Sequence, residues 1–267
     1  MSTRRRSGRS RGARTAAATL ALASLAATAA CSDDPGAGEN GRTKLTVLAA
    51  SSLTEPFETL ADRFEDDHPD VRVAVSFGSS ATIAAQVAAG APADVVATAD
   101  AVTMAILEDD DLVVGDATVF ASNQLALVVP ADNPAGIQEL GDLEQADYVV
   151  CVPSAPCGSL AQQVLKEAGI TRPPASLEVD DKAVLTKVML DEADAGLVYA
   201  SDVVAAGGDV EQVPLPGGTG PATSYPVAVV ARSEHRELAD AWLELLLSPD
   251  GQQALAEAGF GAAEEGR

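Results

Sequence analysis

The chain has 267 residues and carries 40 acidic against 17 basic side chains, which gives a formal net charge of −23 at pH 7. This excess of negative charge excludes a protein that holds nucleic acid or an anionic lipid surface by electrostatic attraction. It also provides no long-range attraction for an anion, so a bound anion would have to be held by local dipoles. The length fits one large or two small domains.

Residues 1–30 have the pattern of a secretory signal sequence. An apolar, Ala-rich stretch without charge, residues 16–30, follows six arginines: Arg4, Arg5, Arg6, Arg9, Arg11 and Arg14. The stretch is too short to span a bilayer as a stable helix and ends in small residues. A cleaved signal is therefore favoured over the alternative of a transmembrane anchor. The arginines leave open whether export uses the general secretory or the twin-arginine route.

Cys31 follows two small residues, Ala29 and Ala30, and precedes a polar, Gly-containing segment. This arrangement resembles a bacterial lipoprotein cleavage site, although Thr28 stands where that pattern usually has Leu. We therefore expect Cys31 to be lipidated. Several acyl chains on this residue would suffice for stable anchoring, which a single chain would not provide. Residues 31–42 then form a flexible tether, and the protein lies outside the cytoplasm, lipid-anchored to the cell membrane.

After the tether, predicted strands and helices alternate along the chain. The first half contains strands at 44–50, 71–77, 94–98 and 124–130 and helices at 55–67, 81–89 and 101–108. The second half contains strands at 148–152, 195–200 and 225–230 and helices at 159–168, 182–191, 234–247 and 249–258. In helix 55–67, for example, Phe57, Leu60 and Phe64 recur on one face.

This alternation predicts an α/β protein with open, mostly parallel sheets flanked by helices. Two such runs in one chain indicate two lobes, with strands 124–130 and 225–230 as the crossings between them. The first lobe would contain residues 43–122 and 225–267, and the second residues 123–224. A ligand is expected in the cleft between the lobes, beyond the carboxyl ends of the strands.

Cys151 and Cys157 remain if Cys31 is lipidated, and an even number of cysteines outside the cytosol predicts a disulfide between them. The alternative is a buried Cys151 in a strand and an unrelated Cys157 in a loop. A bridge across so short a loop would stabilise the fold by only ~2 kcal/mol in the chain-entropy model. Its main effect would therefore be on the shape of the loop.

Four polar or Gly-rich turns follow a predicted strand and precede a predicted helix, at residues 50–56, 77–82, 153–159 and 180–182. A helix N-terminus presents unpaired N–H groups and a positive dipole, so it binds anions without Lys or Arg. For any single turn, a Ser that merely caps its helix is the more common interpretation. The anion-binding interpretation depends on the turns converging at one cleft.

Several of these stretches, taken together and in order, resemble the molybdate-binding proteins of ABC uptake systems, which have the type II periplasmic-binding fold. The resemblance covers nearly the whole chain after the tether. Residues 89–94 (Ala-Gly-Ala-Pro-Ala-Asp), with the preceding Ser79-Ser80 pair, are its most diagnostic part. The matching stretches are residues 47–53, 76–80, 86–94, 196–202 and 225–230.

The resemblance implies a site in which hydroxyl and backbone N–H donors hold a tetrahedral oxyanion. Carried over residue by residue, these donors are the hydroxyls of Ser52 and Ser80, the N–H groups of Cys157 and Asp181, and the phenol of Tyr199. The family often has Ala at the Cys157 position, which matters little if only the N–H is used.

At the Asp181 position the family often has an apolar residue. An ionised carboxylate beside a dianion would be unfavourable unless it points away and caps its own helix. Tyr199, at the end of a buried strand, is by itself more typical of a core residue. Asp202 is expected to cap the helix that follows that strand.

A site made only of donors selects a fully deprotonated dianion over phosphate, whose remaining proton needs an acceptor. Sulfate has the same hydrogen-bond pattern as molybdate, so size must discriminate between them. We therefore expect a monomer without a cofactor that closes like a hinge around molybdate, or tungstate, and delivers it to an ABC importer permease. Molybdenum would enter only as the oxyanion, through the residues named above.

Three alternatives stay open. The first is a binding protein for sulfate or another tetrahedral oxyanion; ferric iron is less favoured, because such sites commonly use adjacent tyrosines and Tyr199 has none beside it. The second is an extracytoplasmic hydrolase, but only His68 and His235 could act as a base. Both lie in charged helical surroundings, and neither a Gly-x-Ser-x-Gly elbow nor zinc-ligand spacing occurs. The third, a passive acidic lipoprotein, leaves the Ser-rich turns unexplained, so we expect a binding protein and not an enzyme.

Overall fold

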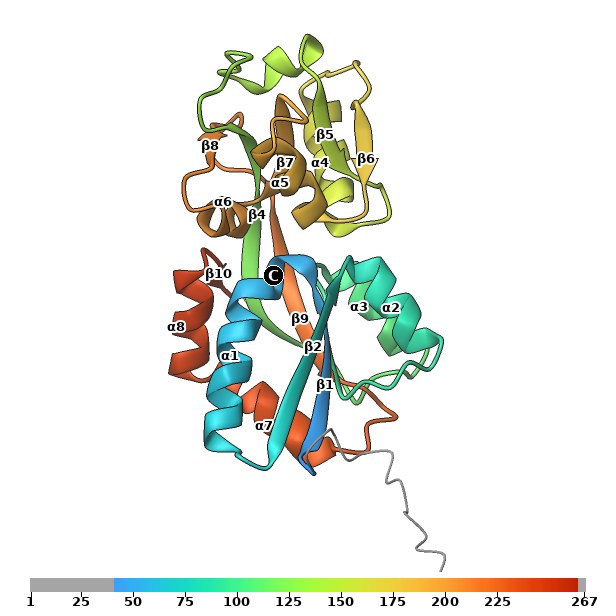
Figure 1. Cartoon of the computed structure of the whole chain (residues 1–267). Coiled ribbons are helices and arrows are strands. Elements are labelled where there is room, and N and C mark those ends of the chain that lie inside the picture. The colour runs from blue at the N-terminus through green and yellow to red at the C-terminus, as the bar shows by residue number, and fades with distance from the viewer. Residues whose placement is uncertain (1–40, 264–267) are drawn as a thin grey trace, which may run out of the picture. The chain divides into compact units, whose positions relative to one another are not determined.

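The computed structural model describes residues 41–263. The predicted signal sequence, the lipidation site Cys31 and the tether up to residue 40 lie outside the described residues. Within residues 41–263, no helix is both long and apolar enough to span a bilayer. The described chain forms two α/β lobes, which lie one above the other in Figure 1.

The first lobe is built on a sheet with the strand order β2-β1-β3-β9-β4. Helices α1, α7 and α8 lie on one side of this sheet and α2 and α3 on the other (Figure 1). Its strands are β1 (Thr43–Ala50), β2 (Val71–Gly78), β3 (Val95–Ala97), β9 (Ala222–Val229) and β10 (Gly261–Ala262). Its helices are η1 (Ser51–Leu53), α1 (Thr54–Asp67), α2 (Ser80–Ala88), α3 (Ala101–Asp109), α7 (Arg236–Leu247) and α8 (Pro249–Glu257).

The sequence of β1 explains why both faces of this sheet are covered. Successive side chains of a strand point to opposite faces, and β1 is apolar on both. Val47 packs into a core with Phe57 and Trp242, whereas its neighbour Leu48 packs into a separate cluster with Ile83 on α2. Two layers of helices are therefore needed to bury one strand.

The second lobe repeats this arrangement around the strands β6-β5-β7. Its strands are β5 (Tyr148–Cys151), β6 (Ser176–Glu178), β7 (Ala195–Tyr199) and β8 (Val210–Val213). Its helices are η2 (Leu140–Glu144), α4 (Pro156–Glu167), α5 (Asp181–Met189) and α6 (Ala200–Ala205). Alternate residues of β5 again pack into two different cores. Val149 packs on the α5 side of the sheet and Val150 on the α4 side.

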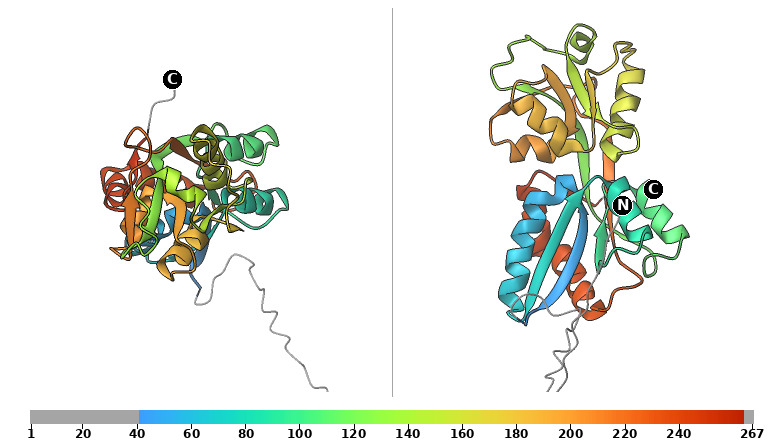
Figure 2. Two further views of the ribbon diagram at one scale, coloured as in Figure 1. Left: turned by 90° about the horizontal axis from the view of Figure 1, so that it is seen from above. Right: turned by 45° about the vertical axis from the view of Figure 1, so that its right-hand side comes forward.

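Strand β4 (Thr118–Pro130) belongs to both lobes and connects them, as the right-hand view of Figure 2 shows. Its residues up to Gln124 pair with β9 in the first lobe. From Leu125 onward it pairs with β7 and β8 in the second lobe. The change of partner falls two residues after the lobe boundary that the sequence predicts at residue 123.

The α/β class and the two-lobe fold predicted from the sequence are confirmed, but the sheets are more mixed than expected. Parallel pairing joins β2, β1 and β3 in one lobe and β6, β5 and β7 in the other. Strand β4 pairs antiparallel with β7, β8, β9 and β10. In the first lobe β9 runs against β1, β2 and β3, and in the second lobe β4 runs against β5, β6 and β7, which the one-dimensional pattern does not reveal.

Candidate functional site

A small cavity of about 10 Å³ lies where turns from the two lobes meet. The first lobe supplies the ends of β1 and β2, and the second supplies the starts of α4 and α5 and the end of β7. Of the five residues predicted to hold the ligand, four line this cavity: Ser80, Cys157, Asp181 and Tyr199. Its other lining residues are Ala50, Ser51, Ser79, Ala99, Ala155 and Pro156.

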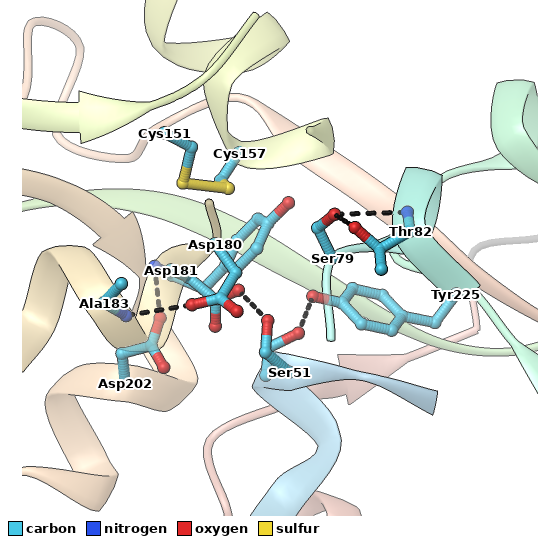
Figure 3. The surroundings of a disulfide bond; sticks show 12 residues. Ser51, Ser79, Thr82, Cys151, Cys157, Asp180, Asp181, Ala183, Asp202 and Tyr225 are labelled. Atoms are coloured by element: carbon cyan, nitrogen blue, oxygen red, sulfur yellow. Dashed lines mark hydrogen bonds between the residues drawn. A yellow bond between two sulfur atoms is a disulfide. The ribbon is translucent and has the colours of Figure 1, made fainter. Parts of the chain in front are cut away.

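Ser51, and not the predicted Ser52, places its side chain at the cavity. The Ser51 hydroxyl donates a hydrogen bond to Asp181 Oδ1 across the two lobes, over 2.5 Å (Figure 3). The hydroxyl of Ser52 instead lies 2.8 Å from Tyr225 Oη, and Ser52 is fully buried. The two serines are the first two residues of the 3₁₀ turn η1, which has about three residues per turn, so neighbouring side chains point in different directions.

Ser79 and Ser80 have different roles at the start of α2. Ser79 caps the helix, because its Oγ accepts a hydrogen bond from the N–H of Thr82 over 3.3 Å. Ser80 Oγ accepts from the N–H of Ala99 over 2.8 Å and is buried. A hydroxyl that accepts one hydrogen bond still has its own hydrogen to donate, so Ser80 can donate into the cavity.

The start of α4 provides backbone donors from the second lobe. Pro156 occupies its first turn and no side chain caps this helix. The first turn of a helix leaves its N–H groups without intrahelical partners, and Cys157 is in that turn at the cavity wall. Its N–H is therefore available to an anion, and the helix dipole favours negative charge there.

A disulfide and a glycine fix the shape of this loop. Cys157 is bonded to Cys151 at the end of β5, with 5.8 Å between the two Cα atoms (Figure 3). A Cβ added at Gly158 would lie 2.0 Å from the carbonyl oxygen of Val152, so no larger residue fits. The loop is thus closely packed on both sides of the Cys157 N–H.

Asp181 does not point away from the cavity as the sequence argument required. The preceding residue, Asp180, takes the capping position and accepts from the N–H of Ala183 over 2.9 Å. The side chain of Asp181 is left facing the interior, where it is only 3% exposed. Burial, reinforced by the negative charge of Asp202, raises the pKa of Asp181 well above its ordinary value.

Asp202 lies beside Asp181 but has stronger partners. Its Oδ2 accepts from the N–H of Tyr199 over 2.9 Å, which is the capping contact expected for α6. Its Oδ1 lies 3.2 Å from Lys182 Nζ, and the same ammonium group lies 2.8 Å from Glu55 Oε1 in the first lobe. Burial raises the pKa of Asp202, and the Lys182 charge and the Tyr199 N–H oppose that effect.

Tyr199 contributes a neutral phenol. The side chain is fully buried with its ring against that of Tyr225, and among the described residues Tyr199 Oη has no hydrogen-bond partner. Burial, with the nearby Tyr225 and Asp181, raises the pKa of Tyr199 well above its ordinary value, so the phenol keeps its hydrogen. A buried phenol normally finds a partner, so an unpaired one at a cavity indicates a ligand position.

Two features of the site were missed in the sequence. One is the Ser51 hydroxyl, which the Ser51-Ser52 pair signals without showing which member faces inward. The other is Tyr225, whose phenol bonds Ser52 and lies 3.5 Å from Asn123 Nδ2 on β4. Asn123 in turn donates to Ser201 Oγ on α6 over 2.8 Å, which extends the buried polar network from the first lobe to the second.

The cavity wall is therefore suited to binding an ion that only accepts hydrogen bonds. Its donors are neutral and come from both lobes: the Ser80 hydroxyl, the Tyr199 phenol and the Cys157 N–H. Among the residues that line the cavity there is no Lys, Arg or His. Lys182, the nearest cation described above, is already paired with two carboxylates.

Comparison with known proteins agrees with this architecture. The model of a family described as bacterial extracellular solute-binding protein matches residues 45–261. The molybdate-binding protein ModA of Mycobacterium tuberculosis (strain ATCC 25618 / H37Rv) is 35% identical over 228 residues, which cover 85% of this chain and 87% of that protein.

Two solved structures share the fold. The periplasmic molybdate-binding protein of Azotobacter vinelandii has a TM-score of 0.73 at 19% identity, covering 82% of this chain and all of that chain (100%). The sulfate-binding protein SubI of M. tuberculosis H37Rv has a TM-score of 0.72 at 23% identity, covering 82% and 86%. At these identities the two likenesses concern the fold alone.

Proposed function

Because this chain belongs to the family of bacterial extracellular solute-binding proteins, we propose that it captures molybdate in the cavity between its lobes and delivers it to an ABC importer. The family is one of binding proteins that work outside the cytoplasm, not of enzymes. The cavity is where a captured ion would lie, since turns of both lobes reach it. Closure of the lobes would shape the surface that the importer permease recognises.

The observation that carries this proposal is the phenol of Tyr199, which has no hydrogen-bond partner within residues 41–263 and is buried beside other neutral donors from both lobes. A fully deprotonated tetrahedral dianion offers only acceptors, which these donors match. Each hydrogen bond to a charged group contributes ~1.5–3 kcal/mol. Micromolar binding corresponds to about 8 kcal/mol, so a handful of such donors suffices.

The choice of molybdate among such dianions is supported by sequence similarity and not by the fold. The molybdate-binding relative is 35% identical over most of both chains. The molybdate-binding and sulfate-binding structures resemble this chain almost equally, with TM-scores of 0.73 and 0.72. Sulfate is therefore the second candidate, and tungstate is proposed as an additional ligand because it matches molybdate in charge and nearly in size.

We also propose that Cys31 carries the lipid that anchors the protein to the outer face of the cell membrane, and that the protein acts as a monomer. The support for the anchor is the run of small residues before Cys31 and the polar segment after it. Replacing Cys31 by Ser should release the protein from the membrane fraction. Continued association of the Cys31→Ser protein with membranes would argue against this anchor.

Isothermal titration with molybdate, tungstate, sulfate and phosphate tests the proposed ligand. We expect molybdate and tungstate to bind with similar affinity and sulfate to bind more weakly. Phosphate should bind least, because at neutral pH it carries a proton that this donor-rich site does not match. Tighter binding of sulfate than of molybdate would replace the proposal with its second candidate.

A further inference from the structure

Asp181 is the one acidic side chain on the wall of the proposed oxyanion cavity. It reaches the wall because Asp180 takes the capping position of α5, and its side chain is 3% exposed. Its Oδ1 accepts from the Ser51 hydroxyl, and its Oδ2 is buried with no hydrogen-bond partner among the described residues. An ionised carboxylate in this position would repel a dianion bound in the same small cavity.

The charges around Asp181 do not offset that repulsion. The groups that face it are Asp202 on α6, Asp180 at the cap of α5, Lys182 on α5, and the phenols of Tyr199 on β7 and Tyr225 on β9. The Lys182 charge is shared between Asp202 and Glu55 of α1. Burial raises the pKa of both phenols, so they remain neutral and add no charge of either sign.

Of the two neighbouring carboxyls, Asp181 is the one suited to hold a proton. Asp202 has two partners that favour its ionised form, Lys182 Nζ at 3.2 Å and the N–H of Tyr199 at 2.9 Å. Among the described residues, Asp181 has the Ser51 hydroxyl and, with a smaller effect on its pKa, its own backbone N–H, but no cation of its own. Burial and the charge of Asp202 also raise the pKa of Asp181, in agreement with this assignment.

We propose that the oxyanion enters this site together with one proton, which Asp181 keeps while the ion is bound. This inference rests on the proposed function, since it requires an anion in the cavity. The ionised protein, one molybdate dianion and one proton from the solution give a complex with a neutral Asp181. The balance is the same whichever carboxyl oxygen carries the hydrogen, so it does not depend on the orientation of the O–H.

The linkage has a defined sign. Binding raises the pKa of Asp181 further, so at a pH above its value in the ligand-free protein each ion takes up a proton. In that range the affinity for molybdate falls as the pH rises, by up to about tenfold per pH unit. At a pH below that value Asp181 is already neutral, and the affinity levels off.

Calorimetry of the purified protein with molybdate measures this uptake directly. Titrations between about pH 6 and pH 9, each in two buffers with different heats of ionisation, give the number of protons taken up per ion. We expect that number to rise toward one with pH while the affinity falls. The Asp181→Asn variant, in which this side chain is neutral at every pH, should show no proton uptake and no fall in affinity as the pH rises. At the high end of the pH range it should bind molybdate more tightly than the unchanged protein.

Asp180→Asn is the matched control, because it removes the same charge one residue earlier and Asn also caps helices. This variant should keep the proton uptake and the fall of affinity with pH, displaced to somewhat lower pH because the Asp180 charge contributes to the raised pKa of Asp181. Loss of the linkage in Asp180→Asn as well would show that Asp181 is not its source and would overturn the assignment.

The remaining outcomes separate this inference from the function on which it rests. Molybdate binding by the unchanged protein without proton uptake at any pH overturns the inference and leaves the proposed function standing. Binding of hydrogen phosphate in preference to molybdate overturns it too, since the ligand would then bring its own proton to an ionised Asp181. If no oxyanion binds, both fail. Should Asp181→Asn not fold, the proton count of the unchanged protein alone decides.

Discussion

The hydroxyl of Ser52 lies 2.8 Å from the phenol oxygen of Tyr225, so the second serine of the Ser51-Ser52 pair makes its hydrogen bond inside the first lobe. This contact fixes the orientation of the turn η1. Ser51 is thereby presented to the cavity, where it bonds Asp181 of the second lobe. Ser52 thus anchors the turn in the first lobe, and Ser51 makes the contact with the second lobe.

Substitutions of the two serines should therefore have different effects. Ser51→Ala should weaken molybdate binding by about tenfold or more, because it removes a hydroxyl from the cavity wall. Ser52→Ala should mainly lower the free energy of unfolding, by roughly 1 kcal/mol, because it removes a buried hydrogen bond. Calorimetric titration and urea denaturation of both variants separate these effects. Equal losses of affinity in the two variants would argue against the orientation described for η1.

Removing single donors from the cavity should lower affinity without unfolding the protein. We expect Tyr199→Phe and Ser80→Ala each to weaken molybdate binding by about tenfold or more, the loss of one hydrogen bond to a charged group. Tyr148→Phe is a matched control, because Tyr148 Oη donates to the carbonyl of Arg172 in the second lobe and is no part of the cavity. Unchanged affinity in both cavity variants would refute the site.

Asp181 should make the ligand-free protein less stable as the pH rises. Its pKa is raised by burial, so the folded state holds a proton that the unfolded state releases above its ordinary pKa of about 4. Stability is therefore lost between that value and the raised pKa of the folded protein. Asp181→Asn should raise the melting temperature at neutral pH, and the gain should vanish below about pH 4. A gain that is the same at every pH would show that the charge of Asp181 is not the cause.

The disulfide between Cys151 and Cys157 should matter more for binding than for folding. Because it closes a short loop, its loss should lower the free energy of unfolding by only about 2 kcal/mol. The same loop carries the Cys157 N–H, so the Cys151→Ala, Cys157→Ala double variant should bind molybdate more weakly while remaining folded. Calorimetry of the unchanged protein under reducing conditions gives an independent comparison. Full affinity after reduction would show that packing around Gly158 alone holds the loop.

Much of the fold could be predicted because the long elements have clear periodicity. Helix α1 and strand β1, for example, were predicted to within one residue of their bounds. The elements missed were short or paired at a distance: β6, β8 and β10 have four residues or fewer, and the first half of β4 depends on pairing with β9. The position of β9 between β3 and β4 likewise depends on contacts between distant parts of the chain, which local sequence patterns do not predict.

The candidate site could be predicted at the level of turns but not of every side chain. The order of motifs placed Ser80, Cys157 and Tyr199 in turns that the structure brings together at the cavity. Which of Ser51 and Ser52 faces inward depends on Tyr225, which is far away in the sequence. The inward position of Asp181 depends on Asp180 taking the helix cap, and the sequence allowed either residue to do so.

A crystal structure of the molybdate-loaded protein, with molybdenum located by its anomalous scattering, tests the central claim most directly. We predict one molybdenum peak in the interlobe cavity, with its oxygens within hydrogen-bond distance of Ser80 Oγ, Tyr199 Oη and the backbone N of Cys157. A peak elsewhere, or a bound ion that touches none of these three groups, would contradict the account.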